Sequence, residues 1–471
     1  MSKLLPNLPI EDLTPENDYI GIIEKGTLLK LFFLNNKHEF SQIKIFSIYG
    51  EWGSGKSTLM KYLERELKGS FNTFFFESWE FESDNNLANS LLEFLTKETD
   101  SKADELLKNG SKLLEGFAKS TTFKTPFANF NMNTLVNEVD KPSFLELKEN
   151  FKSDFENWEN KITTKDKSPD YNIVFIDDLD RCDPENILNL LSAMKLFFTY
   201  GKKTTFLCGI DKKAIREAVK TKYGEIVKAN EYLEKIFDIS FSMPANVDAS
   251  KLINLYFEDD EKVGDKKLGD LIIDFFDKLH FNNPRRIKKI LNKYLILKRL
   301  KQSVDDENIM LPNIIFKNSG TLFETYLTFY LLILNEFEPD IFLNVFDLGS
   351  KKVNYNNVLE RKFKIKSEYD SAKREIIGYF NNGLISKKFK DYSHNDFSNI
   401  KANIYPVNVD DLSLYIFRDA TDFLKYFNLK KKNLEYRFTY FYLFYEDELK
   451  KDFSKSNFSL LNYRSMISNL I

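Results

Sequence analysis

One stretch of the chain decides the fold, and it reads Lys44-Ile45-Phe46-Ser47-Ile48-Tyr49-Gly50-Glu51-Trp52-Gly53-Ser54-Gly55-Lys56-Ser57. Four of its first six residues are β-branched or aromatic and the run stops at a glycine, which predicts a buried strand. The remaining eight fit the pattern G-x-x-x-x-G-K-[ST] at every fixed position, and apolar residues follow at helical spacing as far as Leu67. A strand, a glycine loop and a helix in this order are the context that a phosphate-binding loop requires.

The residue types of this loop suit it to nucleotide binding. Glycines let backbone N–H groups turn toward phosphate oxygens, and the start of a helix adds a positive dipole. We expect Lys56 to reach the β and γ phosphates of ATP and the Ser57 hydroxyl to ligate Mg²⁺. The expected nucleotide contacts are Gly50, Glu51, Trp52, Gly53, Ser54, Gly55, Lys56, Ser57 and Thr58.

An acidic element follows the apolar run at residues 171–176. Asp177, the first acid after this strand, is expected to hold Mg²⁺ through water. Asp178 occupies the position where ATPases of the additional-strand class keep the acid that polarises the attacking water, and a general base there contributes roughly 10²–10⁴ in rate. A helix cap or a salt bridge is the alternative role for Asp178, and a structural ion pair is the alternative for Asp180 and Arg181.

Three further strands complete the predicted sheet. They lie at residues 71–76, 204–211 and 237–243, and the second of them ends in Asp211, where a polar sensor commonly faces the γ phosphate. Five strands that alternate with helices predict an α/β fold with a parallel sheet that binds its ligand at the carboxyl ends of the strands. The expected strand order is 5-1-4-3-2, as in a P-loop NTPase of the additional-strand class.

Ordered motifs over roughly residues 15–300 resemble the KAP family of P-loop NTPases. The loop has that family's Trp-Gly-Ser-Gly-Lys form, and Asp18-Tyr19-Ile20-Gly21 occupies the place where the family begins near the nucleotide base. The other matching segments are Asp177-Asp178-Leu179-Asp180-Arg181-Cys182, Tyr232-Leu233-Glu234-Lys235-Ile236-Phe237 with Met243-Pro244, and Asn283-Pro284-Arg285-Arg286-Ile287-Lys288.

The resemblance implies Mg²⁺-dependent ATP hydrolysis by a switch-like regulatory NTPase, often with a role in the bacterial exclusion of phage. Many members carry transmembrane helices between the second strand and the acidic element. Here the corresponding interval, residues 85–170, contains no apolar run of spanning length, and its pattern predicts a helical insertion. A member without a membrane span is therefore expected, and we predict a cytoplasmic location.

Few arginines are available to stabilise the charge of a transferring phosphoryl group. Arg285 follows Asn283-Pro284 and is expected to act in cis as a sensor, since an arginine finger contributes on the order of 10³–10⁵ in rate. A cation from a neighbouring subunit would be Arg216, Arg181 or Lys235, and the sequence does not separate these three.

The amino-acid composition limits which other classes of protein are possible. The 471 residues carry a net charge of −3, so no global field points to nucleic acid or to an anionic membrane. Two cysteines form no disulfide framework.

The expected organisation is a P-loop ATPase core at 1–84 and 171–245, the insertion at 85–170, a helical extension with the Asn-Pro-Arg element at 246–305, and a helical C-terminal domain at 306–471.

Three functions remain open. The leading hypothesis is a regulatory ATPase whose nucleotide state controls assembly, as a homo-oligomer, or engagement of a protein partner through the C-terminal region, where residues 322–337, 415–427 and 436–449 show helical periodicity. A nucleotide-binding scaffold with little hydrolysis is the second. A nucleic-acid-stimulated ATPase is the third, through the basic helix at 285–301, although a solvated helix face explains that pattern as well. ATP is favoured over GTP because the chain lacks an Asn-Lys-x-Asp motif.

Overall fold

A computed structural model describes residues 4–98, 104–120, 143–164, 168–224, 226–244, 247–257, 261–263, 265–278, 281–307, 322–337 and 339. The chain divides into two compact units. The sheet unit is Leu8–Val247, and the C-terminal unit combines Met1–Asn7 with Asp248–Ile471. The helices predicted at 415–427 and 436–449, and most of the domain predicted at 306–471, lie outside the described residues.

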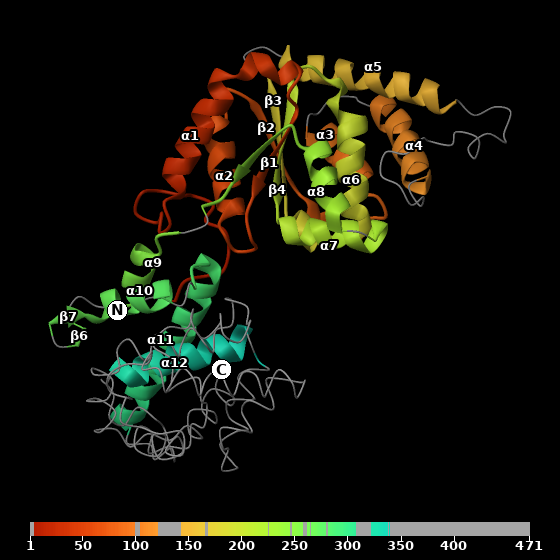
Figure 1. The fold of residues 1–471 in the computed structure, drawn as a ribbon. Coiled ribbons are helices and arrows are strands. Elements are labelled where there is room, and N and C mark those ends of the chain that lie inside the picture. The colour runs from red at the N-terminus through yellow and green to blue at the C-terminus, as the bar shows by residue number, and fades with distance from the viewer. Residues whose placement is uncertain are drawn as a thin grey trace, which may run out of the picture. The chain divides into compact units, whose positions relative to one another are not determined.

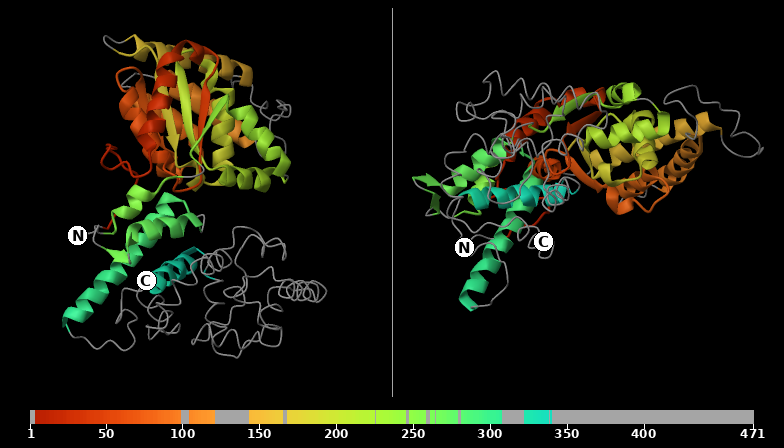
Figure 2. Two further views of the ribbon diagram at one scale, coloured as in Figure 1. Left: turned by 60° about the vertical axis from the view of Figure 1, so that its left-hand side comes forward. Right: turned by 60° about the horizontal axis from the view of Figure 1, so that its bottom comes forward.

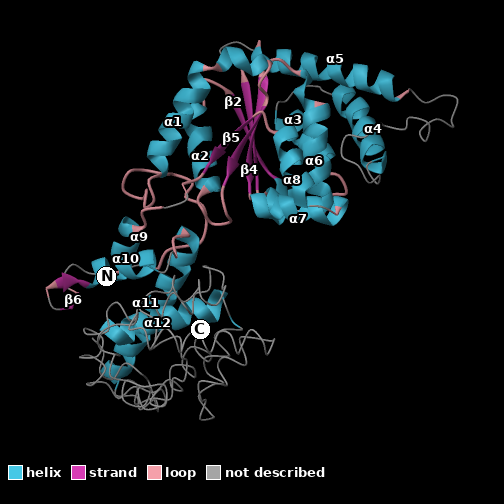
Figure 3. Ribbon diagram, viewed as in Figure 1, coloured by secondary structure: helices cyan, strands magenta, loops and turns pink. Residues whose placement is uncertain are grey.

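A five-stranded parallel sheet forms the centre of the sheet unit (Figures 1 and 3). Its strands are β1 (Ile45–Tyr49), β2 (Asn72–Glu77), β3 (Asn172–Asp177), β4 (Thr204–Ile210) and β5 (Ile239–Ser242). Their order across the sheet is β2-β3-β4-β1-β5. This order is the predicted 5-1-4-3-2 counted from the other edge, so the predicted fold class is confirmed. Each predicted strand lies within two residues of its observed bounds.

Helices cover both faces of the sheet, as the further views in Figure 2 show. Helices α1 (Ile22–Asn35) and α2 (Lys56–Leu67) cover one face, and the other carries α3 (Leu87–Glu98), α4 (Asp104–Ser120), α5 (Phe144–Thr163), α6 (Pro184–Leu196), α7 (Lys212–Tyr223) and α8 (Ile226–Ile236). Alternation along the strands supplies both cores: Phe46 and Ile48 pack with α1 and α2, whereas Ile45 packs on the opposite side. Buried on both faces, these strands read as continuous apolar runs in the sequence.

Short 3₁₀ helices follow several elements of the sheet unit, at Lys37–Ser41, Ser78–Phe81, Leu179–Arg181 and Phe198–Tyr200. The 3₁₀ helix Ser78–Phe81 directly follows β2, and Leu179–Arg181 follows the adjacent strand β3 after one intervening residue. They therefore turn the chain at the carboxyl edge of the sheet, where a ligand is expected.

The C-terminal unit contains α9 (Ser250–Asn254), α10 (Leu268–Lys278), α11 (Pro284–Glu307) and α12 (Leu322–Phe337). A two-residue antiparallel pair, β6 (Lys262–Val263) with β7 (Lys266–Lys267), precedes α10, so the extension predicted as helical also contains a short hairpin. Aromatic rings fill the core of this unit, and the Tyr294 and Phe329 rings stack with their centroids 4.4 Å apart. Asn292 binds the N-terminal segment through the backbone of Leu5, at 3.0 Å and 2.7 Å.

Within the part of the chain that the structure describes, none of the helices has both the length and the apolar composition that a membrane crossing needs.

A buried carboxylate joins α5 to the sheet. Glu159 is 2% exposed and accepts hydrogen bonds from the backbone N–H groups of Lys202, at 2.7 Å, and Lys203, at 2.6 Å, just before β4. Beside it on α5, Phe155 and Trp158 are fully packed in the core. Glu159 therefore fixes the insertion helix to the loop that leads into a central strand.

We predict that Glu159→Ala destabilises the protein by about 1–3 kcal/mol, because it leaves two N–H donors without their acceptor. Glu159→Gln keeps one carbonyl acceptor and should lose less. Urea unfolding followed by circular dichroism measures both, with Asn157→Ala, an exposed position on the same helix, as the control. Equal stability of Glu159→Ala and the control would show that these hydrogen bonds contribute nothing.

Candidate functional site

The glycine loop joins β1 to α2 with backbone angles that favour glycine. Gly53 has φ 83° and Gly55 has φ 95°, both in the left-handed region that L side chains rarely adopt. Gly55 is also the residue that precedes the first turn of α2. The N–H groups of this turn have no partner within the helix, so they present a positively polarised end toward the loop.

The loop is held by hydrogen bonds at both ends. The Lys56 ammonium, on a residue only 6% exposed, donates to the carbonyl oxygens of Gly50 at 2.9 Å and Glu51 at 3.3 Å. The Trp52 N–H donates to the Asp211 carboxylate at 3.0 Å, while the other Asp211 oxygen caps α7. Asp211, predicted as a polar sensor, thus ties the end of β4 to the loop.

Ser57 and Asp177, the predicted metal ligands, lie together. The Ser57 hydroxyl hydrogen-bonds to the carboxylate of Asp177, which is the last residue of β3 and only 4% exposed. Burial raises the pKa of Asp177, and Ser57 and the nearby Lys56 oppose that rise. The Ser57 hydroxyl and the buried, negatively charged Asp177 carboxylate supply two hard oxygen ligands, which are the kind that Mg²⁺ prefers.

A missing side chain on the neighbouring strand makes room for Asp177. A Cβ atom at Gly209 of β4 would lie 2.7 Å from Asp177 Oδ1 and 2.9 Å from Met60 Sδ. Both distances are shorter than real contacts of a Cβ atom. Gly209 therefore allows the carboxylate to lie against the sheet where Ser57 reaches it.

Asp178 adopts a strained backbone. Its φ of 57° and ψ of 24° are left-handed, and among the described residues no other non-glycine has a positive φ. Its Oδ1 atom lies 3.0 Å from Nη2 of Arg181, which is the salt-bridge role that the sequence left open. Burial and the carboxylate of Asp177 raise the pKa of Asp178 to about 6, with Arg181 acting in the opposite direction.

Two residues for which the sequence predicted no role, Glu77 and Trp79, lie beside this acid pair. Glu77 ends β2 in register with Asp177, and its carboxylate lies 3.3 Å from the Lys61 ammonium. The Trp79 ring lies under the Arg181 guanidinium, with 5.0 Å from Cζ to the ring centroid. The sequence offered one signal that could have found both residues. They follow the predicted strand 71–76, and the predicted strand order places this strand beside the one that ends in Asp177.

The other predicted residues have structural partners. Thr58 accepts from the Ile10 N–H at 3.2 Å, and the two carboxylate oxygens of Asp18 accept from the N–H groups that open α1. In the C-terminal unit, Asn283 caps α11 by accepting from the N–H groups of Arg285 and Arg286. The Arg285 side chain donates to the Asn7 carbonyl at 3.2 Å. Its role as a sensor stays a prediction.

The two other candidate cations have the following surroundings. The Arg216 side chain donates to Asn230 Oδ1, at 3.2 Å and 3.3 Å, which joins α7 to α8. Lys235 lies in the last turn of α8. These contacts do not favour Arg216, Lys235 or Arg181 over the other two as the cation that acts in trans.

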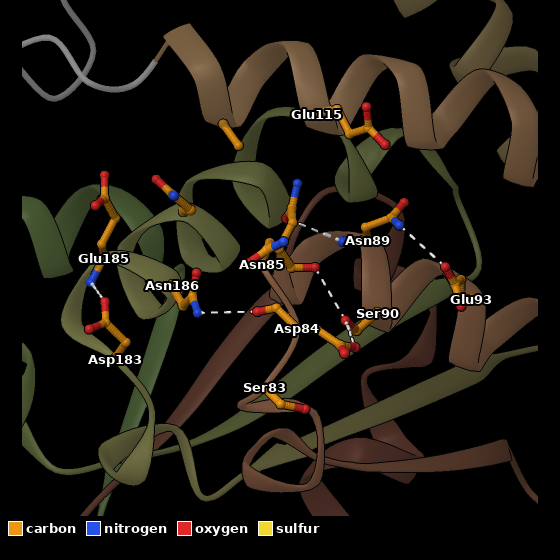
Figure 4. A pocket seen from close by; sticks show the side chains of 13 residues that line it. Ser83, Asp84, Asn85, Asn89, Ser90, Glu93, Glu115, Asp183, Glu185 and Asn186 are labelled. Carbon is orange, nitrogen blue, oxygen red and sulfur yellow. Dashed lines mark hydrogen bonds between the residues drawn. The ribbon is translucent and has the colours of Figure 1, made fainter.

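A separate polar pocket lies between α3, α4 and α6 (Figure 4). Its volume is about 740 Å³, and its lining residues are Ser83, Asp84, Asn85, Asn86, Asn89, Ser90, Glu93, Glu115, Ala118, Asp183, Glu185, Asn186 and Asn189. Several of them bind one another: Ser90 donates to Asp84 at 2.6 Å, and Asp183 accepts from the Glu185 N–H at 2.8 Å. It shares no lining residue with the glycine loop.

The fold and the site define a P-loop nucleotide-binding protein. The model of the KAP family P-loop domain matches residues 33–301, which is more than half of the chain, so the protein belongs to the KAP family. The predicted resemblance is confirmed.

Two curated relatives come from Methanocaldococcus jannaschii. The uncharacterized protein MJ0181 is 40% identical over 120 residues, which cover 24% of this chain and 47% of that protein. The uncharacterized protein MJ0182 is 30% identical over 170 residues, which cover 28% of this chain and 88% of that protein. The chain thus matches less than half the length of the first of these relatives.

Among solved structures, the Aeropyrum pernix ORC2 protein aligns in two forms. Its ADPNP-ADP complexes align over 94% of this chain and 97% of that chain with 11% identity, and its ADP form over 88% and 86% with 12% identity. The TM-score is 0.33 in both cases, too low to inform fold or function.

We predict that Gly209→Ala weakens Mg²⁺-dependent nucleotide binding roughly ten-fold, or ~1.4 kcal/mol, because the added methyl group displaces Asp177 from Ser57. Titration calorimetry with MgADP, and with ADP plus EDTA, measures the metal-dependent part. Gly116→Ala on α4, where a Cβ would have no neighbour within 4 Å, is the matched control. Unchanged MgADP affinity in a folded Gly209→Ala protein would show that Asp177 does not need this space.

Proposed function

We propose that the protein binds ATP with Mg²⁺ at the loop 50–58 and hydrolyses the γ-phosphate, and that its nucleotide state regulates assembly or the engagement of a partner. The observation that carries this proposal is the contact of the Ser57 hydroxyl with the buried Asp177, next to Lys56 and Asp178. Membership in the KAP family supports it.

The proposed chemistry assigns a role to each side chain. Lys56 and the N–H groups of the first turn of α2 bind phosphate oxygens. Ser57 and Asp177 hold Mg²⁺, which neutralises phosphate charge when bound. Asp178 accepts a proton from water as the water oxygen attacks the γ phosphorus. The bond from that phosphorus to the bridging oxygen breaks, and its electron pair leaves with ADP.

The strained position of Asp178 supports its role as the base. Backbone strain of this kind persists only where the surrounding structure enforces it, and it gathers at functional sites. Partial burial keeps the pKa of Asp178 near 6, closer to neutrality than that of a solvated aspartate. Its intact carboxylate, together with Asp177 and Ser57, argues against a scaffold that binds nucleotide without hydrolysis.

We also propose Arg285 as the cis sensor, with Arg181, Arg216 or Lys235 as candidates for a cation in trans. We propose a regulatory output through a homo-oligomer or through a protein partner of the C-terminal region, including a role in defence against phage. This part of the proposal rests on the resemblance of the motifs to KAP NTPases. The loop contacts of Asp211 support a sensor at the end of β4.

Nucleic-acid stimulation receives no support from α11. Lys289 and Lys293 both bind the Glu336 carboxylate on α12, and Lys298 binds Glu261 at 2.6 Å. Two carboxylates thus offset part of the positive charge of the basic helix within the C-terminal unit itself. The helix then has fewer charges to offer to a phosphate backbone.

We expect Lys56→Ala and Asp178→Asn to abolish Mg²⁺-dependent phosphate release from ATP, Asp178→Asn by about 10²-fold or more because it removes the general base. Asp178→Asn should still bind ATP, whereas Lys56→Ala should bind it more weakly. Lys112→Ala, an exposed lysine on α4, is the control. Hydrolysis at the control rate in Asp178→Asn would contradict the role of that residue, and in Lys56→Ala it would contradict the site.

We also expect the mass distribution of Asp178→Asn to differ between ATP and ADP, because this variant holds ATP without converting it. Mass photometry of the full chain with each nucleotide measures the difference, with Lys56→Ala as the control that should not respond. An identical mass with ATP, ADP and no nucleotide would remove assembly as the regulated step and leave engagement of a partner.

A further inference from the structure

A chain of contacts links an exposed aromatic ring to the proposed base. Trp79 is 54% exposed, and the Arg181 guanidinium lies over its ring. Nη2 of the same guanidinium lies 3.0 Å from Oδ1 of Asp178. We call the arrangement of Trp79, Arg181 and Asp178 the Asp178 restraint.

The backbone around Asp178 holds both ends of the ion pair in place. The Arg181 N–H donates to the Asp178 carbonyl at 3.1 Å, and the Cys182 thiol approaches the same oxygen at 3.7 Å. The left-handed turn at Asp178 followed by the 3₁₀ helix Leu179–Arg181 therefore brings the two side chains together. Rotation of the Arg181 side chain would separate the ion pair without breaking these backbone contacts.

The ion pair is partly shielded from water. The Asp178 side chain is 20% exposed and that of Arg181 is 29% exposed, so the attraction between them is stronger than that of a fully solvated pair. The guanidinium contacts the indole ring as well as the carboxylate, and a lysine ammonium, which lacks a planar delocalised cation, stacks less well on such a ring. Trp79 thus fixes the orientation in which Arg181 meets Asp178.

The ion pair competes with an attacking water for Asp178, because the guanidinium holds one carboxylate oxygen turned toward itself at 3.0 Å. We infer that Arg181 restrains Asp178, that Trp79 holds Arg181 in the restraining position, and that the guanidinium must leave the carboxylate before ATP is hydrolysed. This inference rests on the proposed function of the same site, and it assigns Arg181 to the restraint rather than to the cation in trans, which leaves Arg216 and Lys235 for that role.

The test measures kcat and KM for Mg²⁺-ATP in Arg181→Ala, Arg181→Lys, Trp79→Ala and the double variant Trp79→Ala with Arg181→Ala. Arg65→Ala is the matched control: its guanidinium also pairs with a carboxylate, Asp12 at 2.5 Å, and lies over a ring, Tyr62 at 5.4 Å. Arg65 belongs to α2, but its partners lie outside the proposed site.

We expect Arg181→Ala to raise kcat by roughly three-fold or more, a part of the ~10²–10⁴ that a general base contributes, with KM nearly unchanged. Trp79→Ala should raise kcat by less. The double variant should match Arg181→Ala, since both changes release one restraint. Arg181→Lys should fall between the wild type and Arg181→Ala, Arg65→Ala should match the wild type, and Asp178→Asn with Arg181→Ala should be as inactive as Asp178→Asn.

A kcat for Arg181→Ala that equals or falls below the wild-type value overturns the restraint, as does an additive double variant. Unfolding of each variant by urea checks that its fold is intact, and a double-mutant cycle of Trp79 and Arg181 on the free energy of unfolding tests the contact itself without reference to hydrolysis. No coupling in that cycle overturns the part assigned to Trp79.

The two proposals fail in different ways. Hydrolysis that requires Lys56 but does not rise in Arg181→Ala overturns the restraint and leaves the proposed function intact. Hydrolysis that requires Lys56 and appears only in Arg181→Ala supports both. No hydrolysis in the wild type or in Arg181→Ala overturns the proposed function, and the restraint with it.

Discussion

The parallel hydrogen bonding of β1, β3 and β4 is the constraint on which the site depends. Because all three strands run in one direction, their carboxyl ends meet at one edge of the sheet. The glycine loop follows β1, Asp177 ends β3 and Asp211 follows β4. A shift of one residue in the register of β3 would turn Asp177 to the opposite face and away from Ser57. The apolar faces of the strands prevent such a shift, since each packs under its own layer of helices.

Most of this scaffold could be predicted from the sequence. Strand positions, their order and the glycine loop follow from residue patterns a few positions long, because a strand buried on both faces reads as a continuous apolar run and a phosphate-binding loop has fixed spacing. The pairing of Ser57 with Asp177 followed in the same way from two motifs. The left-handed turn at Asp178 did not, since few aspartates adopt this conformation and the surrounding residues do not mark which of them will.

Partners of the charged side chains were also beyond prediction. The sequence left Arg181 as a structural partner of Asp180 or as a cation in trans, whereas in the structure it pairs with Asp178, a choice that depends on side-chain rotamers within a 3₁₀ turn. Glu77 and Trp79 follow a predicted strand, but their contacts with Lys61 and Arg181 need the register of β2 on β3. The basic pattern of α11 similarly gave no sign that Glu336, more than forty positions from Lys289 and Lys293, binds both.

Acids and cations at the carboxyl edge already satisfy one another. Lys61 lies beside Glu77 and Arg181 beside Asp178, while Lys56 lies close enough to Asp177 to favour its charge. Each of these cations therefore has a carboxylate that a polyanion must compete with or rearrange. A nucleotide triphosphate that enters such a site adds negative charge where the carboxylates are partly buried, so its binding cannot leave every pair unchanged. Arg181 is the cation of the three whose carboxylate is the proposed base, and the rearrangement that binding imposes there acts directly on the chemistry.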